Sequence, residues 1–272
     1  MKRLKIFFNK ASNILWLFLK KSDYHHEYIN WQSACNDSLG YDNDKTIKKH
    51  FKSVKNLISG NTLFTRDGVD FHSYQFNYYV STYLLKSAIE NNLKLNVLDF
   101  GGSFGTAFFN YNLFIKDLKS VSWNIVEQPK KVELGNSFFS NTKFKNNLKF
   151  FTSIEHSNSF NKSNIFISCA VIQYVPKPYD IIRQILNSGI KYLIFERVSF
   201  IESKGEIISV QNNISSEGVL FPCWFLNEDK FLNSFSSKYY LTDSSISKIT
   251  KPQSFKKKHK LIWKDFVFKL KK

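Results

Sequence analysis

A glycine-rich turn directly follows an apolar run near the middle of the chain. Residues 94–100 read Lys-Leu-Asn-Val-Leu-Asp-Phe, and Gly101-Gly102-Ser103-Phe104-Gly105 comes next. A short apolar run that ends in glycines is typical of a buried strand that turns into a helix, because glycine accepts backbone angles that other residues avoid. The pattern predicts strand, turn and helix in direct succession, the unit from which parallel sheets are built.

Similar runs continue along the chain and set the predicted fold class. Strands that alternate with helices predict an α/β, Rossmann-like fold with a mainly parallel seven-stranded sheet. The last two strands have no long helix between them, which predicts an antiparallel hairpin at one edge. The predicted strands are 94–100, 121–126, 148–152, 164–169, 192–198, 238–244 and 261–270, and the predicted helices are 45–57, 73–91, 104–118, 130–139, 178–186 and 228–235.

The order of these segments also divides the chain. With 272 residues, the protein is long enough for one large domain with an added arm. We expect an N-terminal helical arm over residues 1–92 and a cofactor-binding domain over residues 93–272. Residues 200–226 break the alternation, so they are expected to form an insert over the sheet.

Two carboxylates narrow the ligand of the glycine turn. A dinucleotide-binding turn holds a pyrophosphate at the helix N-terminus, and Asp99, two residues before Gly101, would repel it. Asp99 instead suits a cationic ammonium group, such as the amino-acid end of S-adenosylmethionine. Glu127 ends the next strand, close to the spacing of about 20 residues expected for an acid that accepts hydrogen bonds from ribose hydroxyls.

These motifs resemble those of a known enzyme class. Residues 96–128 resemble the first two motifs of class I S-adenosylmethionine-dependent methyltransferases. From about residue 31 to 242, the chain resembles an uncharacterised bacterial family of methyltransferases that are encoded near cell-surface polysaccharide genes. The matching residues are Trp31, Gly40-Tyr41, Arg66-Asp67, Phe71, Asp99 to Gly105, Trp123, Glu127-Gln128, Gln173-Tyr174, Arg197, Val210-Gln211, Pro222 and Trp224.

The resemblance implies the class I methyltransferase fold and S-adenosylmethionine as cofactor. It places Glu127 at the ribose and Gln128 at the adenine edge. Ser103 stands where the class prefers glycine, so it adds a hydroxyl to the turn and puts the path of the loop in question. The methionine end of the cofactor would lie against Asp99, Gly101, Gly102 and Gly105.

Residues for the chemistry are expected after the fourth and fifth strands, because ligands bind at the carboxyl ends of such sheets, or in the arm and the insert. Methyl transfer from a sulfonium mainly requires orientation, and a hydroxyl acceptor also benefits from a general base. Glu196 could be that base or only the ion-pair partner of Arg197, and Arg197 could hold an anionic substrate. The catalytic candidates are Gln173, Glu196 and Arg197, and the acceptor-binding candidates are Arg66, Tyr174, Gln211 and Trp224.

Structural interpretations of the same residues stay open at this point. Gln173 is also compatible with a polar helix start, and Trp224 with a core aromatic residue. Arg66-Asp67 carries the same ambiguity between an ion pair and a binding site as Glu196-Arg197.

The net charge of +17 favours anionic partners, although a lysine-rich codon bias explains it equally well. The segment after strand 164–169 lacks the Asp/Asn-Pro-Pro-aromatic motif of enzymes that methylate base amines, so nucleic acid is the less favoured partner. We therefore predict O-methylation of a small-molecule or glycan acceptor, a sugar or cell-surface glycan precursor. The alternatives are an RNA methyltransferase and a non-enzymatic glycan- or membrane-binding protein on a degenerate methyltransferase fold.

The location of the protein is indicated by its N-terminus and its cysteines. Residues 1–21 combine lysines with an apolar run at 14–19 that is too short to span a bilayer. They predict either a basic amphipathic helix on an anionic membrane or a helix packed on its own domain. The three cysteines form no CxxC pair, so we expect no metal site and a cytoplasmic protein, with peripheral contact to the inner face of the membrane through residues 1–21 as one possibility.

Overall fold

The computed structural model describes residues 24, 27–38, 40, 42–203, 205–213, 219–250, 253–255 and 259–271. The amphipathic helix expected at residues 1–21 lies outside these ranges. Among the described helices, none has both the length and the apolar character needed to cross a bilayer.

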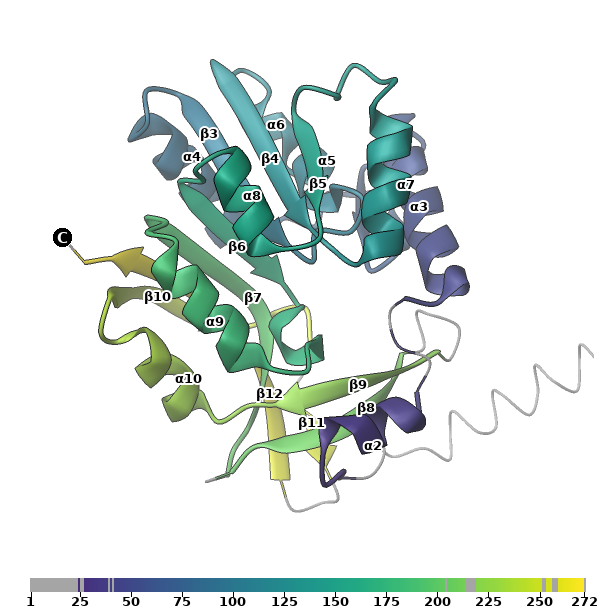
Figure 1. The fold of residues 1–272 in the computed structure, drawn as a ribbon, viewed down its shortest axis with the longest axis vertical. Helices are drawn as coiled ribbons and strands as arrows, with labels where there is room; N and C mark the ends of the chain where they lie inside the picture. The colour runs from purple at the N-terminus through teal and green to yellow at the C-terminus, as the bar shows by residue number, and fades with distance from the viewer. Residues whose placement is uncertain are drawn as a thin grey trace, which may run out of the picture.

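A mainly parallel sheet forms the centre of the molecule (Figure 1). Its strand order is β5-β4-β3-β6-β7-β12-β10, and β11 pairs with one end of β12. β12 runs antiparallel to both β7 and β10. This confirms the predicted α/β fold class, with a seven-stranded sheet and an antiparallel edge hairpin. The strands are β3 (Lys94–Phe100), β4 (Ser120–Val126), β5 (Leu148–Phe151), β6 (Ile165–Cys169), β7 (Tyr192–Ile201), β10 (Tyr239–Ile246), β11 (Gln253–Phe255) and β12 (His259–Leu270).

The strand order reverses at β3, which lies between β4 and β6 and is parallel to both. The chain first moves outward through β4 and β5, and then returns to the other side of β3 with β6 and β7. Connections that leave in opposite directions open a crevice at the carboxyl ends of the strands, where open α/β sheets bind their ligands. The topology therefore positions the site before any side chain is considered.

Helices cover both faces of the sheet (Figure 1). Helices α4 to α7 contribute to the core on one face, together with α3, which packs on α5. Helices α8 to α10 contact the other face. The helices are α3 (Asp44–Ile58), α4 (Tyr78–Ile89), α5 (Thr106–Asn110), α6 (Asn112–Ile115), α7 (Pro129–Phe139), α8 (Ile154–Phe160), α9 (Pro178–Asn187) and α10 (Glu228–Phe235).

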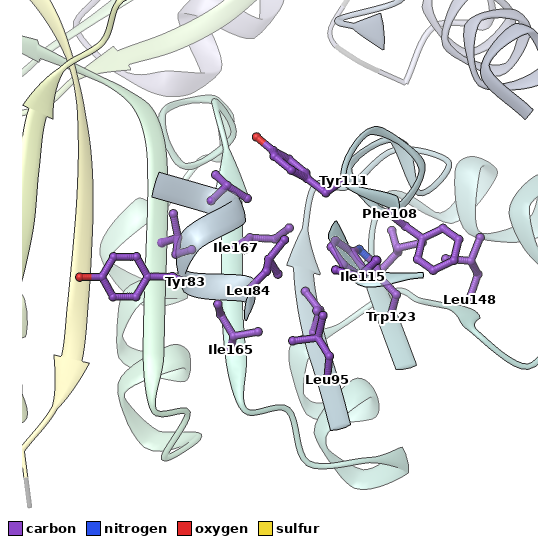
Figure 2. Close-up of a cluster of buried hydrophobic side chains, with 14 of the residues drawn as sticks. Tyr83, Leu84, Leu95, Phe108, Tyr111, Ile115, Trp123, Leu148, Ile165 and Ile167 are labelled. Carbon is purple, nitrogen blue, oxygen red and sulfur yellow. The ribbon is translucent and has the colours of Figure 1, made fainter. Parts of the chain in front are cut away.

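Alternation along the strands divides the apolar side chains between two cores. In β6, Ile165 and Ile167 belong to one core, while Phe166 between them belongs to the other. Figure 2 shows Ile165 and Ile167 in one cluster with Leu84 of α4 and Trp123 of β4. Because both faces are buried, apolar residues occur on both sides of the central strands, as in Ile165-Phe166-Ile167 of β6, and this made the strands recognisable in the sequence.

The predicted helix over residues 104–118 is wrong in one respect, since the chain forms two short helices that meet at Tyr111. Tyr111 leaves helical geometry, and its hydroxyl accepts a hydrogen bond from the Asn77 backbone N–H at 3.2 Å. A tertiary contact thus overrides local helix propensity. Helix α8 had no counterpart in the predicted elements.

The segment before the sheet is not purely helical. Strands β1 (Phe64–Arg66) and β2 (Val69–Phe71) form a hairpin whose two turn residues, Asp67 and Gly68, have φ values of 52° and 71°. Asp-Gly is the pair that such a turn favours, because both residues need positive φ. Helix α4 of the same segment packs directly on β3, β6 and β7.

The insert predicted at residues 200–226 contains a second hairpin. It is made of β8 (Ile207–Asn213) and β9 (Val219–Phe225), and α2 (Trp31–Asn36) contacts both strands. Strand β7 extends to Ile201, so the insert begins later than expected.

The Phe195→Ala variant tests the core behind β7. Phe195 is fully buried and its ring contacts Phe166, Phe231 and Phe268. The lost burial and the cavity left behind should lower the free energy of unfolding by about 3–5 kcal/mol in urea denaturation. Tyr240→Ala, on the exposed edge strand β10, is the control and should change it by less than about 0.5 kcal/mol.

Candidate functional site

A cavity of about 650 Å³ opens at the carboxyl ends of β3, β4 and β6 and beside the middle of β7, where the strand order reverses. It brings together most of the candidates from the sequence. Gly105 and Trp224 are not among its lining residues. The candidates that line it are Arg66, Asp99, Gly101, Gly102, Ser103, Glu127, Gln128, Gln173, Tyr174, Glu196, Arg197 and Gln211.

Asp99 lies beneath the glycine turn. It is almost completely buried, and its carboxylate accepts a hydrogen bond from the Trp123 indole N–H at 2.8 Å. A Cβ atom on Gly102 would lie 2.3 Å from Asp99 Oδ2, so only glycine fits at that position. Burial raises the pKa of Asp99 to about 7, although the hydrogen bond from Trp123 opposes this shift.

The rest of the turn depends on unusual backbone angles. Gly101 has a φ of 74°, and a Cβ atom there would lie 2.5 Å from the side chain of Val171. Ser103 adopts a φ of 54°, which explains why glycine would be favoured at its position. Gly105 begins α5 with a φ of 79° and faces Leu148, so it fixes the start of the helix.

Glu127 is held by three protein donors at the end of β4. Its Oε1 accepts hydrogen bonds from the Ser103 backbone N–H at 3.2 Å and from Lys131 Nζ at 2.8 Å. Its Oε2 accepts one from the Gln128 backbone N–H at 2.8 Å. The side-chain amide of Gln128 reaches the same wall, and its Oε1 is buried with no hydrogen-bond partner.

Two residues of this wall were missed from the sequence, Lys131 and His50. His50 Nδ1 of α3 lies 3.4 Å from Ser103 Oγ. Burial, together with the nearby charge of Lys131, lowers the pKa of His50 to about 4, so the imidazole is neutral at neutral pH. The i,i+4 spacing of Glu127 and Lys131 could have indicated their ion pair, but nothing in the sequence links α3 to this site.

The opposite wall is an ion-pair cluster in the middle of β7, where the pairing of this strand with β6 ends. Arg197 Nη1 donates to Asp67 Oδ2 at 2.9 Å, and Arg197 Nε lies 3.8 Å from Glu196 Oε1. The Arg197 backbone N–H donates to Asp265 Oδ1 at 2.8 Å. Burial opposes the charge of Asp67, but the Arg197 guanidinium holds the pKa of this carboxyl below its usual value. The hairpin β1–β2 is thereby tied to the sheet at the cavity.

Gln173 and Arg197 leave polar atoms without partners beside the cavity. Gln173 Nε2 donates to the Arg197 carbonyl oxygen at 3.0 Å, but Gln173 Oε1 is buried and has no hydrogen-bond partner. Arg197 Nε is in the same state. Beside the cavity, Gln173 Oε1 and Arg197 Nε–H are thus an acceptor and a donor that are available to a ligand.

The remaining acceptor-binding candidates lie in different surroundings. The Arg66 guanidinium lies over the rings of Phe64 and Phe71, at 5.4 and 5.5 Å from their centroids, and donates to the Gln75 carbonyl oxygen. Burial lowers the pKa of Arg66. The Tyr174 hydroxyl donates to Gln211 Oε1. Trp224 stacks on Trp31 outside the cavity, with the two rings 6.1 Å apart.

Backbone strain concentrates around the cavity. In the described part of the chain, six residues other than glycine have a φ in the left-handed region. Such conformations cost free energy and cluster at functional sites. Asp67, Ser103, Ala170 and Arg197 line the cavity, whereas Asn92 and Leu93 form a distant turn.

The described residues contain no group of three or more His, Cys, Asp or Glu side chains that could hold a metal ion. The arrangement offers a glycine turn with two carboxylates on one side, and two further carboxylates balanced by two guanidinium groups on the other. It can therefore hold a cation next to a polar, uncharged group.

The chain is similar to several solved methyltransferases. The N-terminal domain of EvdMO1, solved with S-adenosylhomocysteine and D-fucose, is 8% identical, with 84% of this chain and 100% of that chain covered and a TM-score of 0.49. The O-methyltransferase of a trans-AT polyketide synthase from Brevibacillus brevis, solved with S-adenosyl-L-homocysteine, is 12% identical over 70% and 71% of the two chains, with a TM-score of 0.48.

An S-adenosylmethionine-dependent methyltransferase from Clostridium acetobutylicum is 13% identical over 73% of this chain and 94% of that chain, with a TM-score of 0.43. Neither the family models nor the curated proteins gave a match.

The stability of Asp99→Asn should respond to pH differently from that of the wild type. Burial raises the pKa of Asp99 from 3.8 to about 7. Between pH 3.8 and about pH 7, the folded protein therefore binds more protons than the unfolded chain. The free energy of unfolding of the wild type therefore falls as the pH rises through this range. The variant lacks this titration and keeps an oxygen for Trp123.

Urea denaturation at about pH 5 and about pH 8 measures the effect. We expect the wild type to lose more than about 1 kcal/mol relative to Asp99→Asn between the two values. If the difference in free energy of unfolding between the two proteins does not change with pH, the pKa of Asp99 is not raised in the folded protein.

Proposed function

We propose that the protein is an S-adenosylmethionine-dependent methyltransferase that methylates a hydroxyl of a sugar or of a cell-surface glycan precursor. The observation that carries the proposal is one cavity in which a buried acid lies under a glycine turn, with a second acid on the next strand. The sugar acceptor is taken from the resemblance to the family that is encoded near polysaccharide genes.

We call the side of the cavity with Asp99, the glycine turn, Glu127 and Gln128 the first wall, and the side with Arg197 the second wall. The residues of the first wall fit the amino-acid end, the ribose and the adenine of the cofactor. Asp99 is placed for a cationic amino-acid end, and Glu127 for ribose hydroxyls. Gln128 Oε1, which is buried without a partner, would accept a hydrogen bond from the adenine amino group. A pyrophosphate would instead meet two carboxylates here, which argues against a dinucleotide.

The second wall suits an uncharged acceptor. Arg197 is already paired with Asp67 and lies next to Glu196, and Arg66 brings the second positive charge. Two guanidinium groups and two carboxylates balance each other. The expectation that Arg197 holds an anionic substrate is therefore less favoured by its contacts than binding of a neutral group.

Hydroxyl groups can pair with both atoms of this wall that lack a hydrogen-bond partner, Gln173 Oε1 and Arg197 Nε. A hydroxyl donates one hydrogen bond and accepts others, so neighbouring hydroxyls of a sugar ring would pair with Gln173 Oε1 and Arg197 Nε. These contacts would orient the acceptor for in-line transfer. Glu196, buried beside them, would take the proton of the reacting hydroxyl.

When bound, S-adenosylmethionine supplies an electrophilic methyl group on its sulfonium. The remaining work belongs to the protein: it excludes water, holds the acceptor and moves one proton. Gln173 and Arg197 perform the holding, and Glu196 the proton transfer.

Cofactor binding can be tested by equilibrium dialysis with labelled S-adenosylmethionine. We expect the wild type to bind, and Asp99→Ala to bind at least about tenfold more weakly, because a charge-assisted contact is lost. The affinity of the wild type should rise between about pH 6 and about pH 8, since a cation binds only the ionised form of Asp99, whose pKa is about 7.

Asp70→Ala, which removes an exposed carboxylate of β2, is the control and should leave binding unchanged. Equal binding by the wild type and Asp99→Ala, or none by either, would end the proposal.

The Glu196→Gln variant separates chemistry from binding. Loss of the base should reduce methyl transfer by about 10²–10⁴-fold, while the affinity for S-adenosylhomocysteine stays within about twofold. Transfer of label is measured with a panel of sugars, nucleotide sugars, cell-surface glycan extracts and RNA. Label that enters RNA and no sugar would refute the acceptor class.

A further inference from the structure

We propose that Lys131 is a second ribose-binding residue, which donates a hydrogen bond to one ribose hydroxyl while Glu127 accepts one from the other. The inference rests on the proposed function, because it assumes that the cofactor contains a ribose. It adds a donor to a site for which the sequence indicated only an acid.

Lys131 lies at the wall of the cavity beside the proposed ribose-binding residue Glu127. It lies in the first turn of α7, directly after the cofactor-side residues Glu127 and Gln128, and it lines the cavity. Its side chain is only 4% exposed and its Nζ lies 2.8 Å from Glu127 Oε1. Lysine is almost never buried to this extent unless it is paired, so the ammonium is held at the cavity wall by the carboxylate.

Glu127 already accepts three hydrogen bonds from the protein. A carboxylate offers about four lone-pair sites. Ser103, Gln128 and Lys131 already donate to Glu127, so about one site remains. A ribose diol that donated both of its protons to Glu127 would need two sites. The carboxylate therefore cannot accept from both hydroxyls while its present partners stay in place.

Lys131 has N–H donors available for the ribose hydroxyl that Glu127 cannot accept from. An ammonium carries three N–H donors. Within the described part of the chain, Glu127 is the one hydrogen-bond partner of Lys131 Nζ, so two donors remain. One ribose hydroxyl can donate to the open site of Glu127, while the oxygen of the other accepts from Lys131. The ion pair then presents one acceptor and one donor to the diol.

A purely structural role for Lys131 predicts the opposite change on mutation. If Lys131 only neutralised Glu127, then Lys131→Met would free an acceptor site, and the affinity for S-adenosylhomocysteine would stay the same or increase. If Lys131 is a ligand, the affinity falls. The sign of the change distinguishes the two roles.

The experiment is calorimetric titration of the full chain with S-adenosylhomocysteine. Because Lys131→Met removes a hydrogen bond from a charged donor, it should weaken binding about tenfold or more. Lys130→Met is the matched control. Lys130 is the preceding residue, its side chain is 54% exposed, and its partner is the exposed Asp44. Its replacement should change affinity by less than about twofold.

Deoxy analogues identify the contact itself. The 2′-deoxy and 3′-deoxy forms of S-adenosylhomocysteine are titrated into the wild type and into Lys131→Met. For the analogue that lacks the hydroxyl bound by Lys131, the two proteins should bind equally, since the interaction is already absent. A loss that persists undiminished with both analogues would overturn the proposal.

If the wild type binds and Lys131→Met binds equally or more tightly, the role of Lys131 is refuted and the proposed function stands. If the wild type does not bind S-adenosylhomocysteine, both fail. Should Lys131→Met not fold, as judged by thermal denaturation, Lys131→Gln gives the same test, because its amide keeps a donor without the charge and should lose affinity by a smaller factor.

Discussion

The close packing of the Asp99 carboxylate against Gly102 is the constraint on which the cavity depends. The carboxylate is buried, bonded to Trp123, and so near the turn that a side chain on Gly102 cannot be accommodated. A buried acid that must stay ionisable is a cost to folding, and its raised pKa is the sign of that cost. The protein keeps an unfavourable group where a cationic ligand would compensate it.

The arm that precedes the sheet completes the site from the other side. Asp67, at the tip of the hairpin β1–β2, pairs with Arg197 in the middle of β7, and His50 of α3 faces the glycine turn. Residues that are remote in sequence thus share one cavity. The two walls differ in chemistry, since one carries acids beside glycines and the other balances acids with guanidinium groups.

The sheet and the first wall were predictable because their signals are local. Short strands rich in apolar residues, Asp99 before a glycine turn and Glu127 at the end of the next strand are all visible within short windows of sequence. The pairing of Asp67 with Arg197, the position of His50 and the break at Tyr111 depend on contacts between distant segments, which no local pattern encodes. Lys131 was missed because an i,i+4 ion pair is usually a solvated surface feature.

The place of β12 in the sheet has a consequence for synthesis of the chain. Strand β12 inserts between β7 and β10, and its Asp265 holds the left-handed backbone of Arg197. Until these late residues leave the ribosome, β7 has a bare, apolar edge that is open to pairing with other chains. A nascent chain that stalls before this point would expose that edge and would lack the completed second wall, so assembly of the cavity is among the last events in its folding.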